Sequence, residues 1–370
     1  MKTTKFLTTV VILATVVMLT ASLTEEAYPL PKDPEVIHGN IDIQTPDANT
    51  MEINVQDPKA IINYSSFDIM EHETVNITLP SVNAEILNRD LGIDASQILG
   101  NLNCNGIFIL VNEAGIYVGP NANIDVASLI LSTRDITDQR FLHGEYTFQK
   151  ITEDQLDKLL LNRGKINVRH GGFGVMIAGA VENQGIITAK LGKIALAGGE
   201  AVKLTMSQDG LISVAILTEQ AHDVVDIYGT PITDQIKNTG TLDAEGGTVI
   251  LKAESINGIF TKAVNLEGIV KAATMEEVGG SVHIGTDGRV FIGGAVKTDT
   301  IKIGNEVIPN AVTIEEEANV TAEMLIDINA RDFITIESII QAPMINLTSQ
   351  GGIDTTHAAI INANTLNLAS

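Results

Sequence analysis

A repeat in the second half of the chain constrains its fold more than any other feature. The segments that start at Val181 and Ile236 both carry Asn at +2, Gly at +4, an aliphatic residue at +6, Ala at +8, Gly at +11 and aliphatic residues at +13 and +15. A third copy starts at Val264 and keeps this order from its first Gly onward, except that five extra residues precede its second Gly. Slips between copies are typical of solenoids, in which they are loop insertions.

Within each copy the apolar residues alternate with polar residues, which is the period of a β-strand with one buried face. No Asn-Gly turn joins two alternating runs at two-residue spacing, so these strands are not expected to form hairpins. They must instead stack copy upon copy. The absence of Trp and the low aromatic content of 4% suit a narrow interior of stacked aliphatic residues. The sequence therefore predicts an all-β chain, a parallel β-helix whose residues at +6, +13 and +15 point inward.

The segment 61–150 does not follow the repeat, and it holds seven of the fourteen aromatic residues of the chain. Something other than plain rungs is expected there. Directly after it, Thr152-Glu-Asp-Gln155 has the form of a capping box before Leu156, Leu159 and Leu160, and Gly164 could end a helix. We expect one short amphipathic α-helix at this place, packed on the rod.

The first 22 residues are predicted to be a signal peptide, because Lys2 and Lys5 precede an apolar stretch and small residues follow it. No later segment is apolar over the length that a membrane helix needs, so we expect no stable membrane insertion. The net charge of −23 argues against nucleic acid as a partner. Cys104 is the only cysteine, so no intramolecular disulfide can form, and we expect it to be a small buried residue.

A set of ordered motifs in the N-terminal half resembles the secretion domain of two-partner secretion exoproteins, the filamentous haemagglutinin group. The similarity runs over residues 37–148. It is carried by Ile61-Ile-Asn63-Tyr64-Ser-Ser-Phe67-Asp-Ile69, Leu87-Asn88-Arg89, Gln97-Ile98-Leu-Gly100, Asn105-Gly106, Phe108-Ile-Leu110-Val-Asn112 and Ala127-Ser-Leu-Ile-Leu-Ser132-Thr-Arg-Asp135-Ile136.

This resemblance implies a right-handed parallel β-helix with an N-terminal cap and short extra-helical antiparallel strands. It also implies export to the periplasm, recognition by a cognate outer-membrane transporter barrel through periplasmic receptor domains, and a secreted or cell-surface location. Recognition by strand addition, in which an unfolded strand of the chain pairs with a receptor sheet edge, is one physical route. On this basis residues 30–260 would be the secretion domain, and residues 261–370 would be further rungs of an adhesin-like or haemagglutinin-like rod.

The resemblance also points to recognition residues. The Asn-Pro-Asn-Gly-Ile turn of the family falls on Asn112-Glu-Ala-Gly115-Ile116, where the Pro and the second Asn are missing. Asn112 can still cap a turn and Gly115 can still supply a positive φ, so we expect the turn to persist with weaker preorganisation. The residues that the motifs place in transporter recognition are Asn63, Phe67, Asn88, Arg89, Asn105, Gly106, Asn112, Gly115 and Ile116.

The competing class is a polysaccharide-degrading enzyme, because parallel β-helices also carry lyases and hydrolases. Glycoside hydrolysis needs two carboxylates across a substrate groove, and close pairs such as Asp223 and Asp226 more simply face solvent. The basic pair Arg169-His170 precedes Gly residues, where a turn is expected. We therefore expect no enzyme activity, no metal site and no cofactor. Because the last residues still alternate as in a rung, we also expect Ser370 to be followed by more chain or covered by another subunit.

Overall fold

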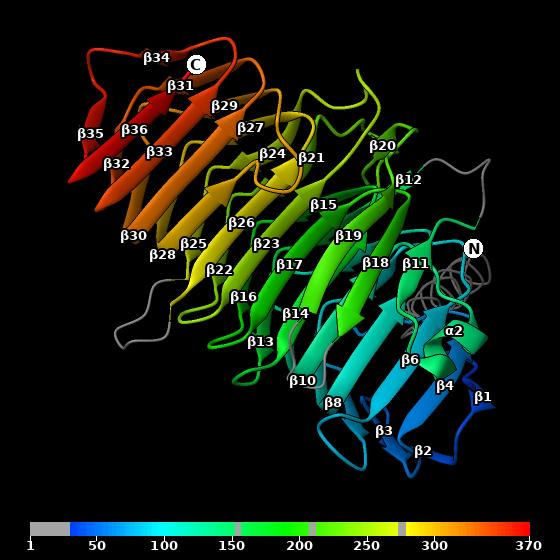
Figure 1. Ribbon diagram of the computed structural model, residues 1–370. Helices are drawn as coiled ribbons and strands as arrows, with labels where there is room; N and C mark the ends of the chain where they lie inside the picture. The colour runs from blue at the N-terminus through cyan, green and yellow to red at the C-terminus, as the bar shows by residue number, and fades with distance from the viewer. Residues whose placement is uncertain (1–29, 152–156, 207–211, 273–278) are drawn as a thin grey trace, which may run out of the picture.

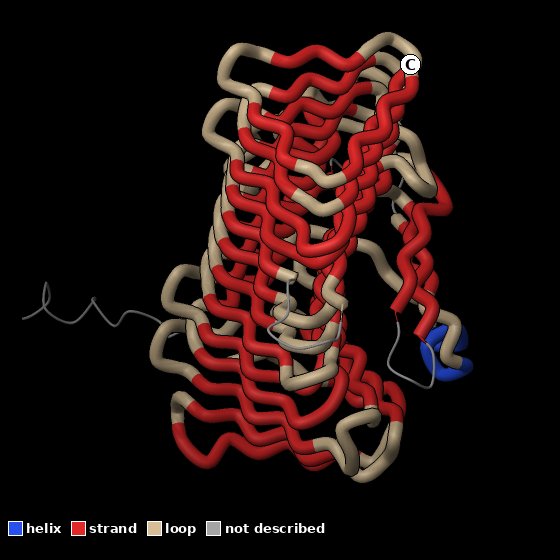
Figure 2. The backbone as a smooth tube through the Cα atoms, turned by 60° about the vertical axis from the view of Figure 1, so that its left-hand side comes forward, coloured by secondary structure: helices blue, strands red, loops and turns tan. Residues whose placement is uncertain are grey.

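The computed structural model describes residues 30–151, 157–206, 212–272 and 279–370, and these form one right-handed parallel β-helix (Figure 1). The chain winds in successive rungs, and most strands pair in parallel with the strand at the same place in the next rung (Figure 2). The fold class expected from the sequence is confirmed. The expected signal peptide, residues 1–22, lies outside the described residues. Within the described part of the chain, no helix has the length and apolar content needed to cross a membrane.

The strands form three walls around one core, and the first two walls belong to one sheet that bends where long strands pass from one wall to the other. The first wall contains β2 (Ile41–Asp47), β3 (Thr50–Val55), β5 (Thr74–Thr78), the first parts of β8 (Asn101–Val111) and β10 (Asn123–Ser132), β13 (Lys165–Val168), β16 (Ile186–Thr188), β22 (Thr241–Asp243), β25 (Ile269–Lys271), the first parts of β28 (Ala295–Ile303) and β30 (Asn319–Ala330), β32 (Ile339–Gln341) and β35 (Ile360–Asn362). The second wall contains β1 (Glu35–His38), β4 (Lys59–Tyr64), β6 (Glu85–Asp90), the later parts of β8, β10, β28 and β30, and β14 (Phe173–Ala178), β17 (Lys193–Gly198), β23 (Thr248–Ala253), β26 (Ser281–Thr286), β33 (Met344–Ser349) and β36 (Thr365–Ala369). The third wall contains β7 (Ser96–Ile98), β9 (Ile116–Val118), β12 (Asp157–Asn162), β15 (Ala180–Asn183), β21 (Asp234–Asn238), β24 (Lys262–Leu266), β27 (Arg289–Ile292), β29 (Ala311–Ile314), β31 (Phe333–Ile336) and β34 (Ile353–Thr355).

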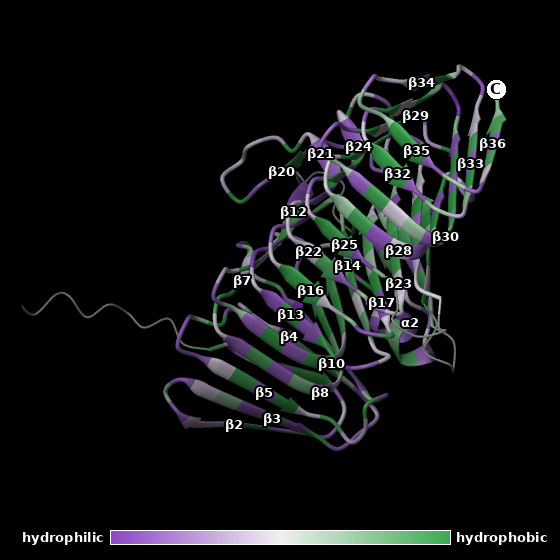
Figure 3. Cartoon of the chain, turned by 90° about the vertical axis from the view of Figure 1, so that its left-hand side faces the viewer, coloured by the Kyte–Doolittle hydropathy of each residue, from purple (hydrophilic) through white to green (hydrophobic). Residues whose placement is uncertain are grey.

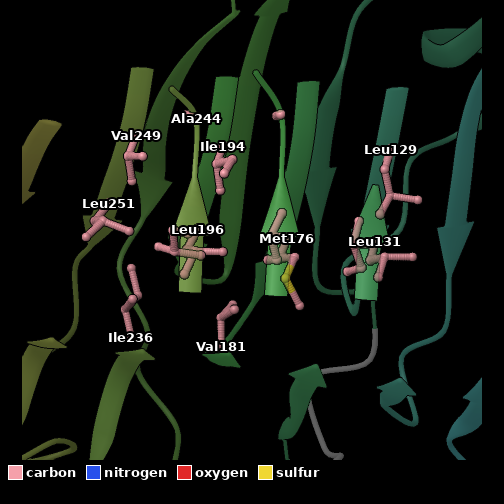
Figure 4. Close-up of a cluster of buried hydrophobic side chains, with 14 of the residues drawn as sticks. Leu129, Leu131, Met176, Val181, Ile194, Leu196, Ile236, Ala244, Val249 and Leu251 are labelled. Atoms are coloured by element: carbon pink, nitrogen blue, oxygen red, sulfur yellow. The ribbon is translucent and has the colours of Figure 1, made fainter. Parts of the chain in front are cut away.

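The stacking register of the rungs follows the sequence repeat, so the inward positions were predicted correctly. Residues at +6, +13 and +15 are consecutive partners along the walls, and all are at most 3% exposed. These ladders are Ile187, Leu242 and Val270, then Ile194, Val249 and Val282, and then Leu196, Leu251 and Ile284. Figure 4 shows part of this core, with the labelled aliphatic side chains of neighbouring rungs pointing into the interior.

The Asn and Gly of the repeat have a structural reason in the corner between the third and first walls. Asn162 Nδ2 donates to Asn183 Oδ1 at 2.7 Å, and Asn183 Nδ2 donates to Asn238 Oδ1 at 2.7 Å, so the three buried amides form a ladder. At the Gly that follows, a Cβ on Gly185 would lie 2.2 Å from the carbonyl oxygen of Gly164 in the rung below. Only glycine fits where two backbones approach so closely.

A second layer covers part of the outer face of the second wall. It consists of α2 (Asp138–His143), β11 (Thr147–Gln149), β18 (Ala201–Met206) and β19 (Ile212–Thr218), which we call the cover. The three strands form an antiparallel sheet, in which β18 lies between β11 and β19. In Figure 2 the helix and the two longer strands stand beside the coil as a separate layer. The extra-helical antiparallel strands implied by the resemblance are thus present.

The short helix lies at a different place from the one expected. The part of the expected helix that is described, Asp157–Asn162, is strand β12, while residues 152–156 with the capping box lie outside the described residues. β12 pairs with β9 on one side and β15 on the other, and Leu160 is fully buried in the core. Pairing along both edges outweighs a local helix signal, because propensity is weaker than tertiary packing. The helix is α2 instead, with Thr137 as its N-cap and Gly144, at φ +76°, as its C-cap.

The N-terminal end of the coil is covered by antiparallel additions, as the resemblance implies. β2 pairs antiparallel with β3, and β1 pairs antiparallel with β4. Ile41 and Ile43 of β2 pack against the edge of the core. At the other end, β36 pairs with β33, and Leu366 and Leu368 are 43% and 59% exposed.

Candidate functional site

A cleft of about 610 Å³ opens where β6 and β8 end and the chain turns from the second wall into the third. It is lined by residues 89–93 and 111–114, by Asp135 and by Lys158. Arg89 and Asn112, two of the residues expected from the motifs, lie in its wall. The cleft therefore brings together two of the nine predicted recognition residues.

The turn expected at Asn112–Ile116 is present. Asn112 Oδ1 accepts a hydrogen bond from the Ala114 amide at 2.7 Å, and the Gly115 amide donates to the Asn112 carbonyl oxygen at 3.1 Å. Gly115 has φ +115°, a region that favours glycine. Ile116 then begins β9 with its side chain fully buried in the core. The prediction that this turn persists without the Pro and the second Asn of the family motif is confirmed.

Asp90, which the sequence did not single out, is the centre of the hydrogen-bond network under the cleft. Its Oδ2 accepts from the Phe67 amide at 2.9 Å, from Ser96 Oγ at 2.5 Å and from Asn112 Nδ2 at 3.0 Å. Asn112 Nδ2 also donates to Ser96 Oγ at 2.9 Å. Three donors on one oxygen satisfy the hydrogen-bonding capacity of this side chain, which is 6% exposed. The network joins three segments that are far apart in the sequence.

Phe67 and Asn88 lie in the core below this network. The Phe67 ring stacks edge-on against Tyr64 with centroids 5.0 Å apart, and it lies 5.9 Å from the Phe108 ring. Asn88 accepts from the Tyr64 hydroxyl at 3.2 Å and donates to the Ile109 carbonyl oxygen at 3.2 Å. Phe67 and Asn88 are fully buried. They shape the cleft from within and are not on its surface.

Arg89 connects the cleft to the cover. Its Nε donates to Asp135 Oδ1 at 2.8 Å, and its Nη1 lies 2.5 Å from Asp138 Oδ1 in the first turn of α2. A second guanidinium nitrogen, Nη2, donates to the Ile136 carbonyl oxygen. A forked guanidinium suits this kind of multiple contact. Arg89 therefore anchors the start of the cover to β6.

The three remaining motif residues do not join the cleft. The Asn105 side chain pairs with the backbone of Leu79 as a neighbouring strand would. Its Oδ1 accepts from the Leu79 amide at 2.6 Å, and its Nδ2 donates to the Leu79 carbonyl oxygen at 2.9 Å. A Cβ on Gly106 would lie 2.6 Å from the Ala84 carbonyl oxygen. Asn63 lies on β4 beside Arg89 of β6, and its buried Oδ1 has no hydrogen-bond partner. Asn105 and Gly106 therefore help to hold the first rungs together, whereas no side-chain contact gives Asn63 such a role.

A buried ion pair that the sequence did not reveal is a second link between the coil and the segments next to the cover. Arg134 is 1% exposed, and its Nη1 lies 3.0 Å from Asp157 Oδ1. Its Nε donates to the Gly199 carbonyl oxygen at 3.0 Å, and its Nη2 donates to Gln220 Oε1 at 3.0 Å. Lys150 lies 3.4 Å from the same Asp157 oxygen. The only sequence signal was an Arg at the end of the apolar run 127–132.

A third polar cluster lies under α2, beside a cavity of about 530 Å³. The Tyr146 hydroxyl lies 2.6 Å from both carboxylate oxygens of Glu85, and Lys59 Nζ lies 3.5 Å from Glu85 and 2.6 Å from the Phe141 carbonyl oxygen. Burial raises the pKa of the Glu85 carboxyl, although Tyr146 and Lys59 act in the opposite direction. Burial also raises the pKa of Tyr146. The cluster therefore joins β4 and β6 of the coil to the end of α2 and the residues that follow it.

Cys104 has no place in these sites. It is 2% exposed within the core, and burial raises the pKa of its thiol to about 11. A thiol with so high a pKa is protonated at neutral pH and is a poor nucleophile. The expectation of a small buried residue is confirmed.

Comparison with known proteins agrees with this architecture. The family model described as the TPS secretion domain matches residues 29–298. A heme/hemopexin-binding protein of Haemophilus influenzae is 29% identical over 267 residues, which is 70% of this chain and 28% of that protein. A second protein of that name from Haemophilus influenzae is 25% identical over 344 residues, which is 86% of this chain and 34% of that protein. The chain thus spans about a third or less of the length of these relatives.

Among solved structures, the HMW1 secretion domain from Haemophilus influenzae superposes with a TM-score of 0.67 at 20% identity. The superposition covers 91% of this chain and all of that domain, so the two share a fold. The family match covers most of the chain, and the cap, the coil and the cover are all in place. The chain therefore belongs to the family of two-partner secretion (TPS) secretion domains, whose exoproteins are exported through a TPS transporter of the outer membrane.

Proposed function

We propose that this chain is the exported partner of a two-partner secretion pair, and that periplasmic receptor domains of its cognate outer-membrane transporter read the first rungs around the cleft. The observation that carries this proposal is the family match over residues 29–298, which includes every element that builds the cleft and the cover. A leader at residues 1–22 would bring the chain to the periplasm. The mature chain would then reach the cell surface or the medium.

The distal rungs would serve as an adhesin-like rod. In the later part of β30 and in β33, the second wall buries only alternate side chains, so its outer face is open to a ligand or a surface there. Solenoids present such extended faces to partners. Nothing in the match carries haem or hemopexin binding from the named relatives to this chain, because it covers 28% and 34% of their lengths.

We further propose that the chain is not an enzyme. The carboxylate of Asp226 accepts backbone hydrogen bonds from Tyr228 and Thr230, both at 2.8 Å, so it closes a turn. These hydrogen bonds support a structural role, not a catalytic one, for the acidic pair Asp223 and Asp226. A carboxylate engaged in this way has fewer lone pairs free for acid or base catalysis.

Secretion with and without the transporter tests the export proposal. The chain with its leader is expressed in a Gram-negative host alone, with the intact cognate transporter, or with a transporter that lacks its periplasmic domains. We expect the chain in the medium only with the intact transporter, and in the periplasm otherwise. Phe333→Ser changes a 48% exposed position on the distal rod, outside the first rungs, and should leave secretion through the intact transporter unchanged. Equal secretion in all three hosts would contradict the proposal.

A further inference from the structure

The chain contains two Asn-Gly pairs, which begin at Asn105 and Asn257, and the fold places them in different surroundings. An Asn side chain followed by Gly is chemically labile, because the Gly backbone nitrogen can attack the side-chain carbonyl carbon with no Cβ in the way. The attack needs both groups to be free to approach each other. The structure therefore decides which of the two pairs can react.

The first pair is held in the coil. Asn105 and Gly106 belong to β8, which pairs with β10 on one side and with β5 and β6 on the other. Asn105 Oδ1 accepts from the Leu79 amide at 2.6 Å, and its Nδ2 donates to the Leu79 carbonyl oxygen at 2.9 Å. The side chain would have to break both hydrogen bonds before it could meet the Gly106 nitrogen. Reaction at Asn105 therefore requires local opening of the first rungs.

The second pair lies in the turn between β23 and β24, where both of its residues are exposed. One hydrogen bond, from the Ile259 amide to the Ile256 carbonyl oxygen at 3.4 Å, closes this turn. Among the residues that the structure describes, the Asn257 side chain and the Gly258 amide have no hydrogen-bond partner. Gly258 has φ +95°, and a Cβ there would meet no atom within 4 Å. Neither reacting group is held away from the other.

We propose that Asn257 is a site of spontaneous deamidation in the folded chain. The Gly258 backbone nitrogen attacks Cγ of Asn257, so a new C–N bond closes a succinimide ring. The bond from Cγ to Nδ2 breaks, and Nδ2 takes up the proton that the Gly258 nitrogen loses and leaves as ammonia. Water then opens the ring at either carbonyl carbon. The products are aspartate and isoaspartate in place of Asn257, and water is the sole co-reactant.

The reaction would change the charge of a second cleft on the coil. Asn257 and Gly258 line a cleft of about 300 Å³ together with Asp287 and Arg289. Either product replaces a neutral amide with a carboxylate, which the Arg289 guanidinium attracts and the Asp287 carboxylate repels. Isoaspartate also lengthens the main chain of the turn by one carbon. The modification thus alters one surface loop and leaves the interior ladders of the coil in place.

Mass spectrometry of the folded, full-length mature chain, incubated at mildly alkaline pH, tests the inference. Trypsin releases the peptide 253–262, in which Asn257 is the only asparagine. We expect this peptide to gain the mass of one deamidation at least about tenfold faster than Asn105 does in the same sample, because Asn105 must wait for local opening. In urea, the two Asn-Gly pairs should react at similar rates, since the fold no longer protects Asn105.

Gly258→Ala should slow the reaction at Asn257, because the added Cβ hinders attack by the backbone nitrogen. Gly171→Ala is the matched control: Gly171 also has a positive φ, +76°, and open space around its Cβ position, so the substitution brings the same strain at a distant turn. It should leave the reaction at Asn257 unchanged, and circular dichroism should show both variants folded.

Three results would overturn the inference. If Asn257 stays intact in the folded chain and reacts only in urea, the turn holds the pair in a geometry that cannot react. If Asn105 reacts as fast as Asn257 in the folded chain, the fold does not select between the pairs. If Gly258→Ala reacts like the wild type, the change at Asn257 does not pass through the succinimide. None of these results depends on the transporter, so the export proposal is tested separately.

Discussion

The two halves of the second wall have the same backbone and different environments. Under the cover, β6 and β14 are buried at every position, whereas β33 at the distal end buries every second residue. The sequences differ accordingly: Phe173-Gly-Val-Met-Ile-Ala178 is apolar throughout, and Met344-Ile-Asn-Leu-Thr-Ser349 alternates. Figure 3 shows such alternating bands along the strands of the first wall, over which the described residues form no second layer. A parallel strand loses its alternation when both of its faces are buried.

This difference gives the two parts of the coil different sources of stability. The covered half has a second apolar cluster, built from outward residues of the wall and from the cover, in addition to the continuous interior core. Distal rungs rely on the interior core and on their neighbours. The cover is joined to the coil by Arg89 and by the Lys59–Glu85–Tyr146 cluster, so these polar contacts fix where the second layer lies.

The largest expected effect is a charge placed in the interior core of the covered half. Leu196→Asp or Val249→Asp would bury an unpaired carboxylate between two rungs, and we expect a loss of stability on the order of 5 kcal/mol. Leu347→Asp, at an equally buried position near the distal end, should cost less, because the terminal rungs can open locally. Chemical denaturation followed by circular dichroism measures both. Wild-type stability of Leu196→Asp would show that the rung register is wrong.

The next effect isolates the cover. Phe148 of β11 is fully buried in the second apolar cluster, and Phe148→Ala should lower the free energy of unfolding by about 3 to 5 kcal/mol. Phe333→Ala on the uncovered distal rod should change it by about 0.5 kcal/mol or less. Proteolysis of the folded variants would show whether the loss is local, since cleavage should then concentrate in the cover. Equal effects of the two changes would remove the distinction between the halves.

The smallest effect is a pH dependence that belongs to the covered half. Burial raises the pKa of Glu85 above the ordinary glutamate value of 4.5, so the folded state binds a proton more tightly than the unfolded state. The resulting stability is fully present below pH 4.5 and is lost as the pH rises through the folded pKa. Glu85→Gln keeps a neutral side chain, so its stability relative to the wild type should increase as the pH rises through this window. Urea titrations at several pH values measure it.

Glu323→Gln on the exposed distal wall is the control for this pH dependence. Its stability should follow that of the wild type at each pH. A parallel profile for Glu85→Gln and the wild type would show that Glu85 has the same pKa in the folded and unfolded states.

The turn in the candidate site could be inferred from residues close together in the sequence, whereas the contacts between distant segments could not. The Asn112 turn follows from residues three apart, because an Asn side chain and a Gly with positive φ close a turn by themselves. Asp90 was not found, since its partners Phe67 and Asn112 lie 23 and 22 residues away. The exposure of Ile93 was also invisible, because a sequence does not show which aliphatic residue the fold leaves uncovered.

The sequence by itself determined the coil, and only the tertiary structure decided what lies upon it. Stacked rungs must repeat the same inward positions, so the ladder from Ile194 to Val249 and Val282 was readable as a period. The helix was expected after residue 151 and lies at Asp138–His143, because β12 gained two neighbouring strands that a local capping signal cannot represent. The Arg134–Asp157 pair likewise joins residues that no period relates. Stacking is a nearest-neighbour interaction with a fixed spacing, whereas the contacts of the cover are long-range and occur only once.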